Sequence, residues 1–423
     1  MLKKLVITIS LFLIFTSPVH SRERFFQVQS VDTMKYSRDL AREKLKDNTF
    51  NQEIETQVKN IAATGATHVS LGTPYEDEFL PYLKRWVTAA RKYKLKVWFR
   101  GNLAGWEEWF DYPRIDRSTH IGKIQNFILS NPDLFEDGDV FTSCPECENG
   151  GPGDPRKTRD IEGFRNFIAA EYKAVKEGFD QTGKKVKANF YSMNGDVARL
   201  IMDRETTEKL DGAVTIDHYV STPEKLENDI VELAEQSGGK IVLGEFGAPI
   251  PDIHGDLSEE QQASWIDEAL DRTIKTGKVI AVNYWTYNAS STRLWENDNS
   301  PRLAASALEK YYNPVNVYGR IIDSKGNLIK DVNLKMTDIG FLVKNGIYAI
   351  PIINEESLTF SKKGFVSVNF PVRAAKEKDI KRDVVLSVSS ENPIYNWWRR
   401  VVDFLNTTNK QIRQIIQINP ANK

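Results

Sequence analysis

Short apolar runs alternate with longer amphipathic segments along most of the chain. From about Phe25 to Tyr312, runs rich in β-branched and aromatic residues are followed by stretches whose apolar positions have helical spacing. This alternation is typical of parallel βα units. The predicted strands are Phe25–Val31, His68–Leu71, Lys96–Phe99, Val140–Ser143, Val186–Phe190, Ala213–Asp217, Ile241–Gly244 and Ile280–Trp285.

The segments between these strands predict helices. They include Ile54–Thr64, Leu83–Tyr93, Ile161–Phe179, Pro223–Gln236, Glu259–Thr276 and Ala304–Tyr312. Eight units at this spacing favour a closed (β/α)8 barrel, the TIM barrel, over an open doubly wound sheet. The first strand is not followed by the Gly-x-Gly-x-x-Gly of dinucleotide-binding folds. We therefore expect an α/β protein with a TIM barrel over residues 22–313.

The pattern changes after Asn313-Pro314. Short alternating strands separated by turns predict a small all-β sandwich over residues 314–390. This segment resembles the carboxypeptidase regulatory-like sandwich. The residues that carry the resemblance are Gly319-x-x-x-Asp323-x-x-Gly326, Gly346-x-Tyr348 and Lys362-Lys363-Gly364-Phe365. The resemblance implies a structural or attachment role, so we assign this domain no chemistry.

The two ends of the chain differ from the domains between them. A basic start at Lys3 and Lys4, an apolar run and Ser21 predict a signal peptide over residues 1–21 and a secreted or extracytoplasmic protein. The alternative is an uncleaved membrane anchor. Residues 391–423 predict a helical tail that contains Trp397 and Trp398. It would lie on a cell surface or polymer, or dock on its own protein, and we favour docking.

Composition excludes several functional classes. Lys+Arg 57 against Asp+Glu 58, with no basic stripe, argues against nucleic acid as a partner. The two cysteines, Cys144 and Cys147, are too few for a structural zinc site, and we expect a disulfide or a thiol pair that shapes its loop. The five histidines show no paired metal-ligand spacing. We expect a monomer with no cofactor and no metal.

Polar and aromatic residues gather where the predicted strands end. In TIM-barrel enzymes the active site lies at the carboxyl ends of the strands. The candidates there are Arg100, Asn102, Glu146, Glu148, Asn149, Tyr191, Asn194, His218, Tyr219, Glu245 and Trp285.

Two of these carboxyl groups suit glycoside hydrolysis. Retention of configuration requires a nucleophile and a proton donor about 5–5.5 Å apart. The run Lys240-Ile241-Val242-Leu243 would carry Glu245 to the rim of the barrel, where an unpaired carboxylate is costly unless it has a task. We predict that Glu245 is the nucleophile. The alternative is a purely structural ion pair between Glu245 and Arg100.

The barrel resembles the clan A glycoside hydrolases over Phe25 to Tyr312. The matching pieces are Ile241-Val242-Leu243-Gly244-Glu245-Phe246-Gly247, His218-Tyr219 and Trp285. The resemblance implies an acid/base glutamate after strand four and a nucleophile after strand seven. It also implies that Tyr219 donates to Glu245, and that Trp285 lies beneath the sugar ring, extended by Trp98, Trp106 or Trp109 unless these are core.

The strand-four motif departs from the clan's Asn-Glu, because Pro145 occupies the place of the asparagine. Glu146 aligns with the clan's acid/base glutamate and is our choice, with Glu148 as the alternative. Asn149 or Asn194 would then replace the missing amide. His218 is either a hydrogen-bond partner of Glu146 or the substrate, or a core histidine.

The sequence thus predicts a secreted retaining glycoside hydrolase that cleaves β-glycosidic bonds of a polysaccharide or oligosaccharide by double displacement. The alternative is a TIM-barrel protein that binds carbohydrate without cutting it. A Schiff-base lyase would need a lysine at the carboxyl rim, but Lys187 lies early in its strand. A metal-dependent hydrolase lacks the paired histidines that such a site requires.

Overall fold

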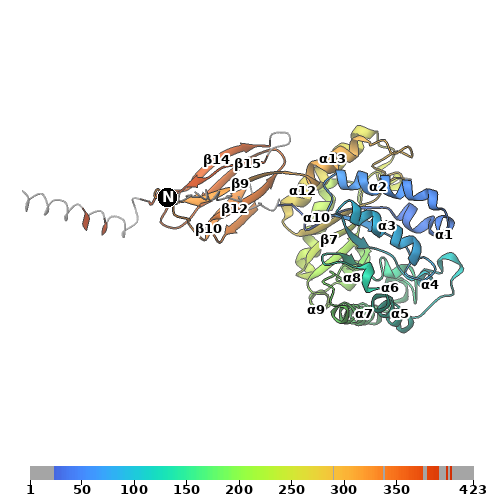
Figure 1. The fold of residues 1–423 in the computed structure, drawn as a ribbon. Coiled ribbons are helices and arrows are strands. Elements are labelled where there is room, and N and C mark those ends of the chain that lie inside the picture. The colour runs from blue at the N-terminus through green and yellow to red at the C-terminus, as the bar shows by residue number, and fades with distance from the viewer. Residues whose placement is uncertain are drawn as a thin grey trace, which may run out of the picture. The chain divides into compact units, whose positions relative to one another are not determined.

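The fold was analysed in a computed structural model that describes residues 23–288, 290–336, 339–374, 379–389, 397–398 and 401–402. The predicted signal peptide and most of the predicted tail lie outside these residues. The chain divides into two compact units (Figure 1). One comprises Arg24–Pro314 with Met336–Gly340, and the other comprises Glu23, Val315–Lys335 and the described residues from Phe341 onward.

The first unit is built on eight parallel strands. They are β1 Val28–Asp32, β2 His68–Leu71, β3 Lys96–Phe99, β4 Val140–Phe141, β5 Ser192–Asn194, β6 Ala213–Asp217, β7 Lys240–Phe246 and β8 Val279–Tyr284. Their order in the sheet is β4-β3-β2-β1-β8-β7-β6-β5. A parallel bridge between Val140 and Lys187 joins the two edges, and the amide of Phe141 donates to the carbonyl of Lys187 at 2.8 Å. The predicted (β/α)8 fold is confirmed.

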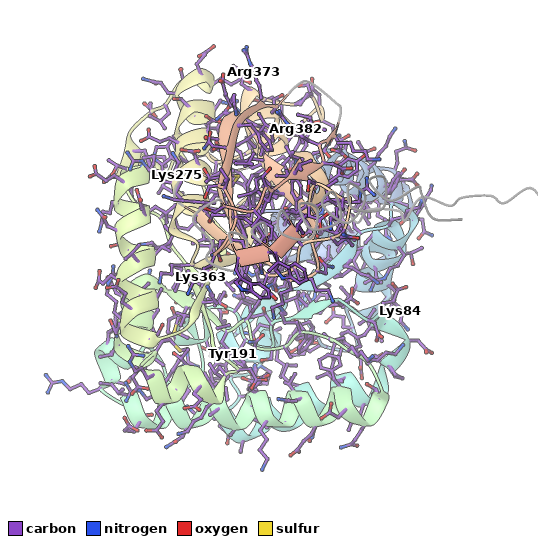
Figure 2. All side chains as sticks on the ribbon, turned by 90° about the vertical axis from the view of Figure 1, so that its left-hand side faces the viewer. Lys84, Tyr191, Lys275, Lys363, Arg373 and Arg382 are labelled. Atoms are coloured by element: carbon purple, nitrogen blue, oxygen red, sulfur yellow. A yellow bond between two sulfur atoms is a disulfide. The ribbon has the colours of Figure 1, made fainter. Side chains whose placement is uncertain are left out.

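Helices surround the sheet. They are α1 Ala41–Lys44, α2 Asn51–Ala63, α3 Leu80–Lys92, α4 Ala104–Glu107, α5 Arg117–Ser130, α6 Pro155–Thr158, α7 Ile161–Thr182, α8 Gly195–Ile201, α9 Arg204–Lys209, α10 Pro223–Ser237, α11 Pro251–His254, α12 Glu259–Thr276 and α13 Leu303–Tyr312. Figure 2 shows Lys84 of α3 and Lys275 of α12 on the outside of this layer. Within the described part of the chain, no helix is long and apolar enough to cross a membrane.

Five strands, β1, β4, β5, β7 and β8, differ in extent from the prediction, and the differences in β5 and β7 bear on the site. The fifth lies later, because residues 186–190 contribute only the bridge at Lys187, while Ser192–Asn194 pair with β6. Between them the Asn189 side chain donates to the carbonyl of Leu210 at 3.1 Å. The seventh strand continues through Phe246 and therefore contains Glu245.

Apolar side chains fill the inside of the barrel. The layer consists of Val28, Trp98, Val140, Phe190, Ala213, Val242 and Ala281. Trp98 is fully buried, its ring meets Phe190 edge-on at 5.4 Å, and its indole nitrogen donates to Thr142 Oγ1 at 2.9 Å. Trp98 is therefore core. Trp106 is also buried, whereas Trp109 is half-buried beneath the guanidinium of Arg38.

The second unit is all β. Its strands are β9 Val315–Ile322, β10 Val332–Met336, β11 Ile339–Val343, β12 Ile347–Ile352, β13 Glu355–Ser361, β14 Val368–Arg373, β15 Ile380–Lys381 and β16 Val384–Val385. They form a sheet in the order β11-β10-β13-β14 and a second in which β12, β15 and β16 pair with β9. Buried and exposed residues alternate along β10, as expected for a strand with one face on a core. The expected all-β domain is present, and its likeness to the carboxypeptidase regulatory-like family stays a prediction.

Trp98 and Trp109 differ in burial, and this difference tests whether Trp98 belongs to the barrel core. Trp98→Ala should lower the free energy of unfolding by about 3–5 kcal/mol, because it removes a large buried side chain and leaves a cavity. Trp109→Ala, the matched control, should cost less than about 1 kcal/mol, since its ring is partly in solvent. Denaturant unfolding followed by far-UV circular dichroism measures both. Equal losses would contradict the assignment of Trp98 to the core.

Candidate active site

A buried arginine organises the carboxyl ends of the strands. Arg100 follows β3, and its side chain is fully buried. Its Nη1 lies 3.1 Å from Asp32 and 3.0 Å from Glu245, and its Nη2 lies 2.8 Å from Asp217 and 3.1 Å from Ser192 Oγ. Burial alone would lower the pKa of Arg100, but the charges of the three carboxyl groups outweigh it and raise that pKa. One cation thus connects β1, β5, β6 and β7.

A bulge in β7 brings Glu245 opposite Asp217. The register between β6 and β7 shifts by one residue, so that Ile216 faces Leu243 and Asp217 faces Glu245. Gly244 is the residue passed over. A Cβ atom at this position would lie 2.3 Å from Asp217 Oδ1, so a side chain would collide with the carboxyl group. Bulges of this kind re-aim side chains next to active sites.

The environment of Glu245 contains opposing influences. Burial raises its pKa to about 7; Arg100 lowers it, the nearby charges of Glu146 and Asp32 raise it, and a hydrogen bond from Tyr219 lowers it. The Tyr219 hydroxyl donates to Glu245 Oε2 at 2.9 Å. Burial also raises the pKa of Tyr219, so this hydroxyl keeps its proton near neutral pH.

Asp217 shares Arg100 with Glu245. Burial raises the pKa of Asp217 well above its usual range; Arg100 lowers it, and the charges of Glu245 and Glu146 raise it further. The single positive charge of Arg100 faces three carboxyl groups in a buried place, which favours retention of a proton by the cluster.

The loop after β4 carries Glu146 in an unusual conformation. Cys144 and Cys147 form a disulfide, with their Cα atoms 5.2 Å apart across a tight turn. Glu146 lies in the left-handed region, with φ 45° and ψ 49°, which costs a non-glycine residue about 1–2 kcal/mol. Its amide donates to the carbonyl of Ser192 at 2.8 Å. Asn149 donates to Glu146 Oε2 at 3.2 Å.

The charge of Glu146 acts on the buried cluster that Arg100 forms with Asp217 and Glu245. Its charge raises the pKa values of Glu245, Asp217 and Arg100, and its side chain is half-buried rather than sealed in the core. The geometry agrees, because the Glu146 amide donates to the carbonyl of Ser192, and Arg100 donates both to the Ser192 hydroxyl and to Glu245. The structure therefore brings this strand-four glutamate and Glu245 to the same end of the barrel.

Glu148 is more deeply buried than Glu146. Its side chain accepts from the amide of Asn194 at 2.6 Å, while Oε2 has no hydrogen-bond partner among the described residues. Burial raises the pKa of Glu148 to about 7; the Asn194 amide lowers it and the charge of Glu146 raises it. Burial thus favours the protonated form of Glu148, and its carboxyl group is tied to the end of β5. Both strand-four glutamates remain acid/base candidates on this geometry.

Three other predicted residues have partners within the fold. His218 contacts Asp229 of α10 at 2.8 Å, and Gly195 leaves room for its ring, because a Cβ there would lie 2.4 Å from Nδ1. Burial lowers the pKa of His218. Tyr191 accepts from Ser143 Oγ at 3.1 Å and is buried. The side-chain oxygen of Asn194 accepts from the amide of Asp196 and so caps α8.

Asn102 and Trp285 complete the predicted set. Asn102 is buried, and its side-chain oxygen accepts from the amide of Leu103 and lies 2.8 Å from His120 Nε2. Trp285 follows β8, is half-buried, and donates its amide to the carbonyl of Phe246 at 3.0 Å. Trp285 is therefore partly accessible at the carboxyl end of the barrel. Asn102 lies in the packed loop after β3.

The sequence analysis did not select four polar residues that the structure places in this region: Asp32, Ser192, Asp217 and Glu107. An acidic residue at the end of a buried strand was the available signal for Asp32 and Asp217. Glu107 of α4 had none. Burial raises the pKa of Glu107 to about 8; Arg38 lowers it, and Glu146 and Glu148 raise it. Glu107 is therefore a third carboxyl group near the strand-four glutamates.

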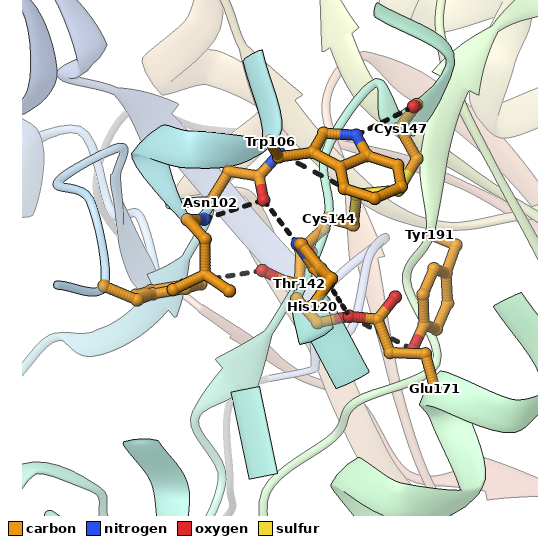
Figure 3. The surroundings of a disulfide bond; sticks show 11 residues. Asn102, Trp106, His120, Thr142, Cys144, Cys147, Glu171 and Tyr191 are labelled. Atoms are coloured by element: carbon orange, nitrogen blue, oxygen red, sulfur yellow. Dashed lines mark hydrogen bonds and ion pairs between the residues drawn. A yellow bond between two sulfur atoms is a disulfide. The ribbon is translucent and has the colours of Figure 1, made fainter. Parts of the chain in front are cut away.

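One group of side chains resembles a metal site in its ligand types. Among the described residues, ligand atoms of His120, Cys144 and Glu171 lie within 4.8 Å of one another (Figure 3). The sulfur of Cys144 is bonded to Cys147, so it offers no thiolate to a metal in this state. We assign these residues to the support of the loop.

Comparison with known proteins defines the fold. The sequence matches no known family profile and no curated protein. A GH5_18 protein from Streptomyces cattleya, in complex with Manb1-4GlcNAc, is similar with a TM-score of 0.52 at 14% identity, over 71% of this chain and 85% of that chain. A Bifidobacterium longum GH5_18 protein in complex with the same sugar has a TM-score of 0.49 at 12% identity, over 73% and 84%.

A longer protein is also similar. Bacteroides uniformis beta-glucuronidase 2 has a TM-score of 0.43 at 11% identity over 80% of this chain, and the match spans only 44% of the glucuronidase. Of the three structures, the Streptomyces cattleya protein has a TM-score above 0.5, and at 14% identity it shows a shared fold and no more.

The buried Glu148 predicts a specific pH dependence. Its raised pKa in the folded state means that the protonated form is favoured, so this contribution to stability is full below the ordinary value of 4.5 and is lost as pH rises through about 7. Glu148→Gln keeps the acceptor for Asn194 and removes the charge. Relative to wild type, its free energy of unfolding should rise by up to about 3 kcal/mol between about pH 4 and pH 8.

Denaturant unfolding at several pH values measures this difference. Glu309→Gln, at an exposed position on α13, is the matched control and should show no such trend. A difference between Glu148→Gln and wild type that stays constant with pH would contradict the burial of an ionisable carboxyl group at this position.

Proposed function

We propose that the protein is a secreted retaining glycoside hydrolase that cleaves β-glycosidic bonds of a polysaccharide or oligosaccharide. The observation that carries this proposal is the setting of Glu245. Glu245 projects from the bulge in β7 and accepts hydrogen bonds from Arg100 and Tyr219. The charge of Glu146, in the loop after β4, raises the pKa of Glu245. Two carboxyl groups from these strands are what a double displacement in a barrel requires.

Glu245 would attack the anomeric carbon and form a glycosyl-enzyme. Arg100 and Tyr219 each donate to one of its oxygens, which fixes the carboxylate and leaves further lone pairs for the attack. The same donors stabilise the carboxylate when it leaves the sugar in the second step. One proton retained by the three carboxyl groups would keep Arg100 from facing three full negative charges.

A strand-four glutamate would protonate the departing oxygen and then take a proton from the attacking water. Glu146 remains our choice, because its charge acts on Glu245 and its side chain is accessible. Glu148 remains the alternative, because burial raises its pKa and favours the protonated form that a proton donor needs. Trp285 would supply the apolar surface under the sugar ring. The sugar bound to the two GH5_18 proteins makes β-linked mannosides a first class to test.

Substitution of the glutamates separates their roles. Glu245→Gln should lower kcat/KM by about 10⁴-fold or more on every substrate, because no glycosyl-enzyme can form. Glu146→Gln should keep kcat/KM on dinitrophenyl glycosides, whose leaving group needs no proton, and lose about 10²–10⁴-fold on phenyl glycosides. Added azide should raise kcat of the Glu146 variant and yield a β-glycosyl azide.

The assay uses dinitrophenyl and phenyl β-glycosides of mannose, glucose, xylose and their β-linked disaccharides, followed by mannans, glucans and xylans. Glu309→Gln is the control and should behave as wild type. Azide rescue of Glu148→Gln in place of Glu146→Gln would move the acid/base assignment to Glu148. Sugar binding with no turnover on any substrate would favour the non-catalytic alternative.

A further inference from the structure

The disulfide encloses the proposed acid/base residue. Cys144 and Cys147 bracket Pro145 and Glu146, and the cross-link closes a turn of four residues. Pro145 fixes one backbone angle of the turn. Glu146 occupies the next position in a left-handed conformation that a glycine would adopt more readily. A residue held in such a conformation at the carboxyl end of a barrel strand indicates a functional constraint.

Both ends of this turn accept hydrogen bonds from the segment after β3. Figure 3 shows Asn102 beside Cys144 and Trp106 beside Cys147. The Asn102 amide lies 3.7 Å from Cys144 Sγ, and the Trp106 indole donates to the carbonyl of Cys147 at 2.9 Å. The turn is therefore held by one covalent bond within itself and by two donors from a neighbouring strand end.

Trp106 provides a rigid base for the turn. Its ring is buried and stacks on Phe167 at 5.1 Å, with an interplanar angle of 14°. The chain that follows the turn closes over it, since the amide of Gly151 donates to the carbonyl of Trp106 at 2.8 Å. A Cβ atom at Gly151 would lie 2.2 Å from the ring. The sequence therefore needs a glycine where the loop crosses the indole.

A buried polar pair orients Asn102. His120 Nε2 lies 2.8 Å from the Asn102 side-chain oxygen, and His120 Nδ1 lies 2.8 Å from Glu171. His120 and Glu171 are fully buried. With its oxygen committed to His120 and Leu103, Asn102 turns its amide nitrogen toward the disulfide.

We propose that the Cys144–Cys147 disulfide, seated on Asn102 and Trp106, positions Glu146 for proton transfer to the glycosidic oxygen. This rests on the proposed function. Without the cross-link, the backbone of Glu146 can leave the left-handed conformation and carry its carboxyl group away from Glu245. Glu148 keeps its own anchor on the Asn194 amide, so the loss is specific to Glu146.

Removal of the disulfide tests the proposal on the full chain. The double variant Cys144→Ala/Cys147→Ala should lose about 100-fold in kcat/KM on the phenyl glycoside that wild type cleaves. Its kcat/KM on the matching dinitrophenyl glycoside should stay within about twofold of wild type, because that leaving group needs no proton. The alkaline limb of the pH profile on the phenyl substrate should disappear, since this limb reports the proton donor.

A double-mutant cycle with Glu146→Gln distinguishes positioning from general damage. If the disulfide acts through Glu146, its removal should cause no further loss on the phenyl glycoside in the Glu146→Gln background. Trp106→Phe keeps the stacked ring and removes only the indole donor. It should lower kcat/KM on the phenyl glycoside by about tenfold or less and leave kcat/KM on the dinitrophenyl glycoside nearly unchanged. This variant replaces the cysteine variant in the test if circular dichroism shows that the cysteine variant does not fold.

Three results would overturn the proposal alone, provided that Glu146→Gln still behaves as an acid/base variant. They are equal losses on both substrates, additive losses in the cycle, and a cysteine variant as active as wild type on the phenyl glycoside. If wild type cleaves no glycoside at all, the proposed function fails and this inference fails with it.

Discussion

The guanidinium group of Arg100 carries a positive charge into a part of the barrel where three carboxyl groups converge. Burying this charge without partners would be prohibitively costly, and burying the carboxyl groups without it would be equally so. The strand ends that supply Asp32, Asp217 and Glu245 must therefore meet around it. The bulge at Gly244 and the hydrogen bond from Tyr219 have a function only because this cluster holds together.

Much of the architecture could be read from local sequence patterns. The eight strands, the helices between them and the all-β segment follow from apolar spacing, which local residues determine. The fifth strand was misplaced because the run 186–190 pairs with β4 only at the bridge between Val140 and Lys187, while Ser192–Asn194 pair with β6. Patterns of spacing do not show which residues of a segment will pair with a strand that is distant in sequence.

The site was predictable only in part, and for a physical reason. Glu245 lies near the end of a buried strand and Tyr219 follows another, so their positions could be inferred from the topology, and the structure shows them in contact. The pairing of His218 with Asp229, and the sharing of Arg100 among four groups, depend on three-dimensional packing. The left-handed backbone at Glu146 could not be inferred either, because glutamate rarely adopts it. The roles of these residues in turnover stay proposals.

The filled interior of the barrel limits how a substrate could enter and leave the proposed site. Trp98 and Phe190, with the small and branched residues around them, close the barrel beneath Arg100 as packed core rather than as a pore. If the proposed function holds, a sugar chain would have no route along the barrel axis. Substrate would then arrive at, and product leave from, the carboxyl end of the strands, so departure of a cleaved fragment and arrival of new chain would compete.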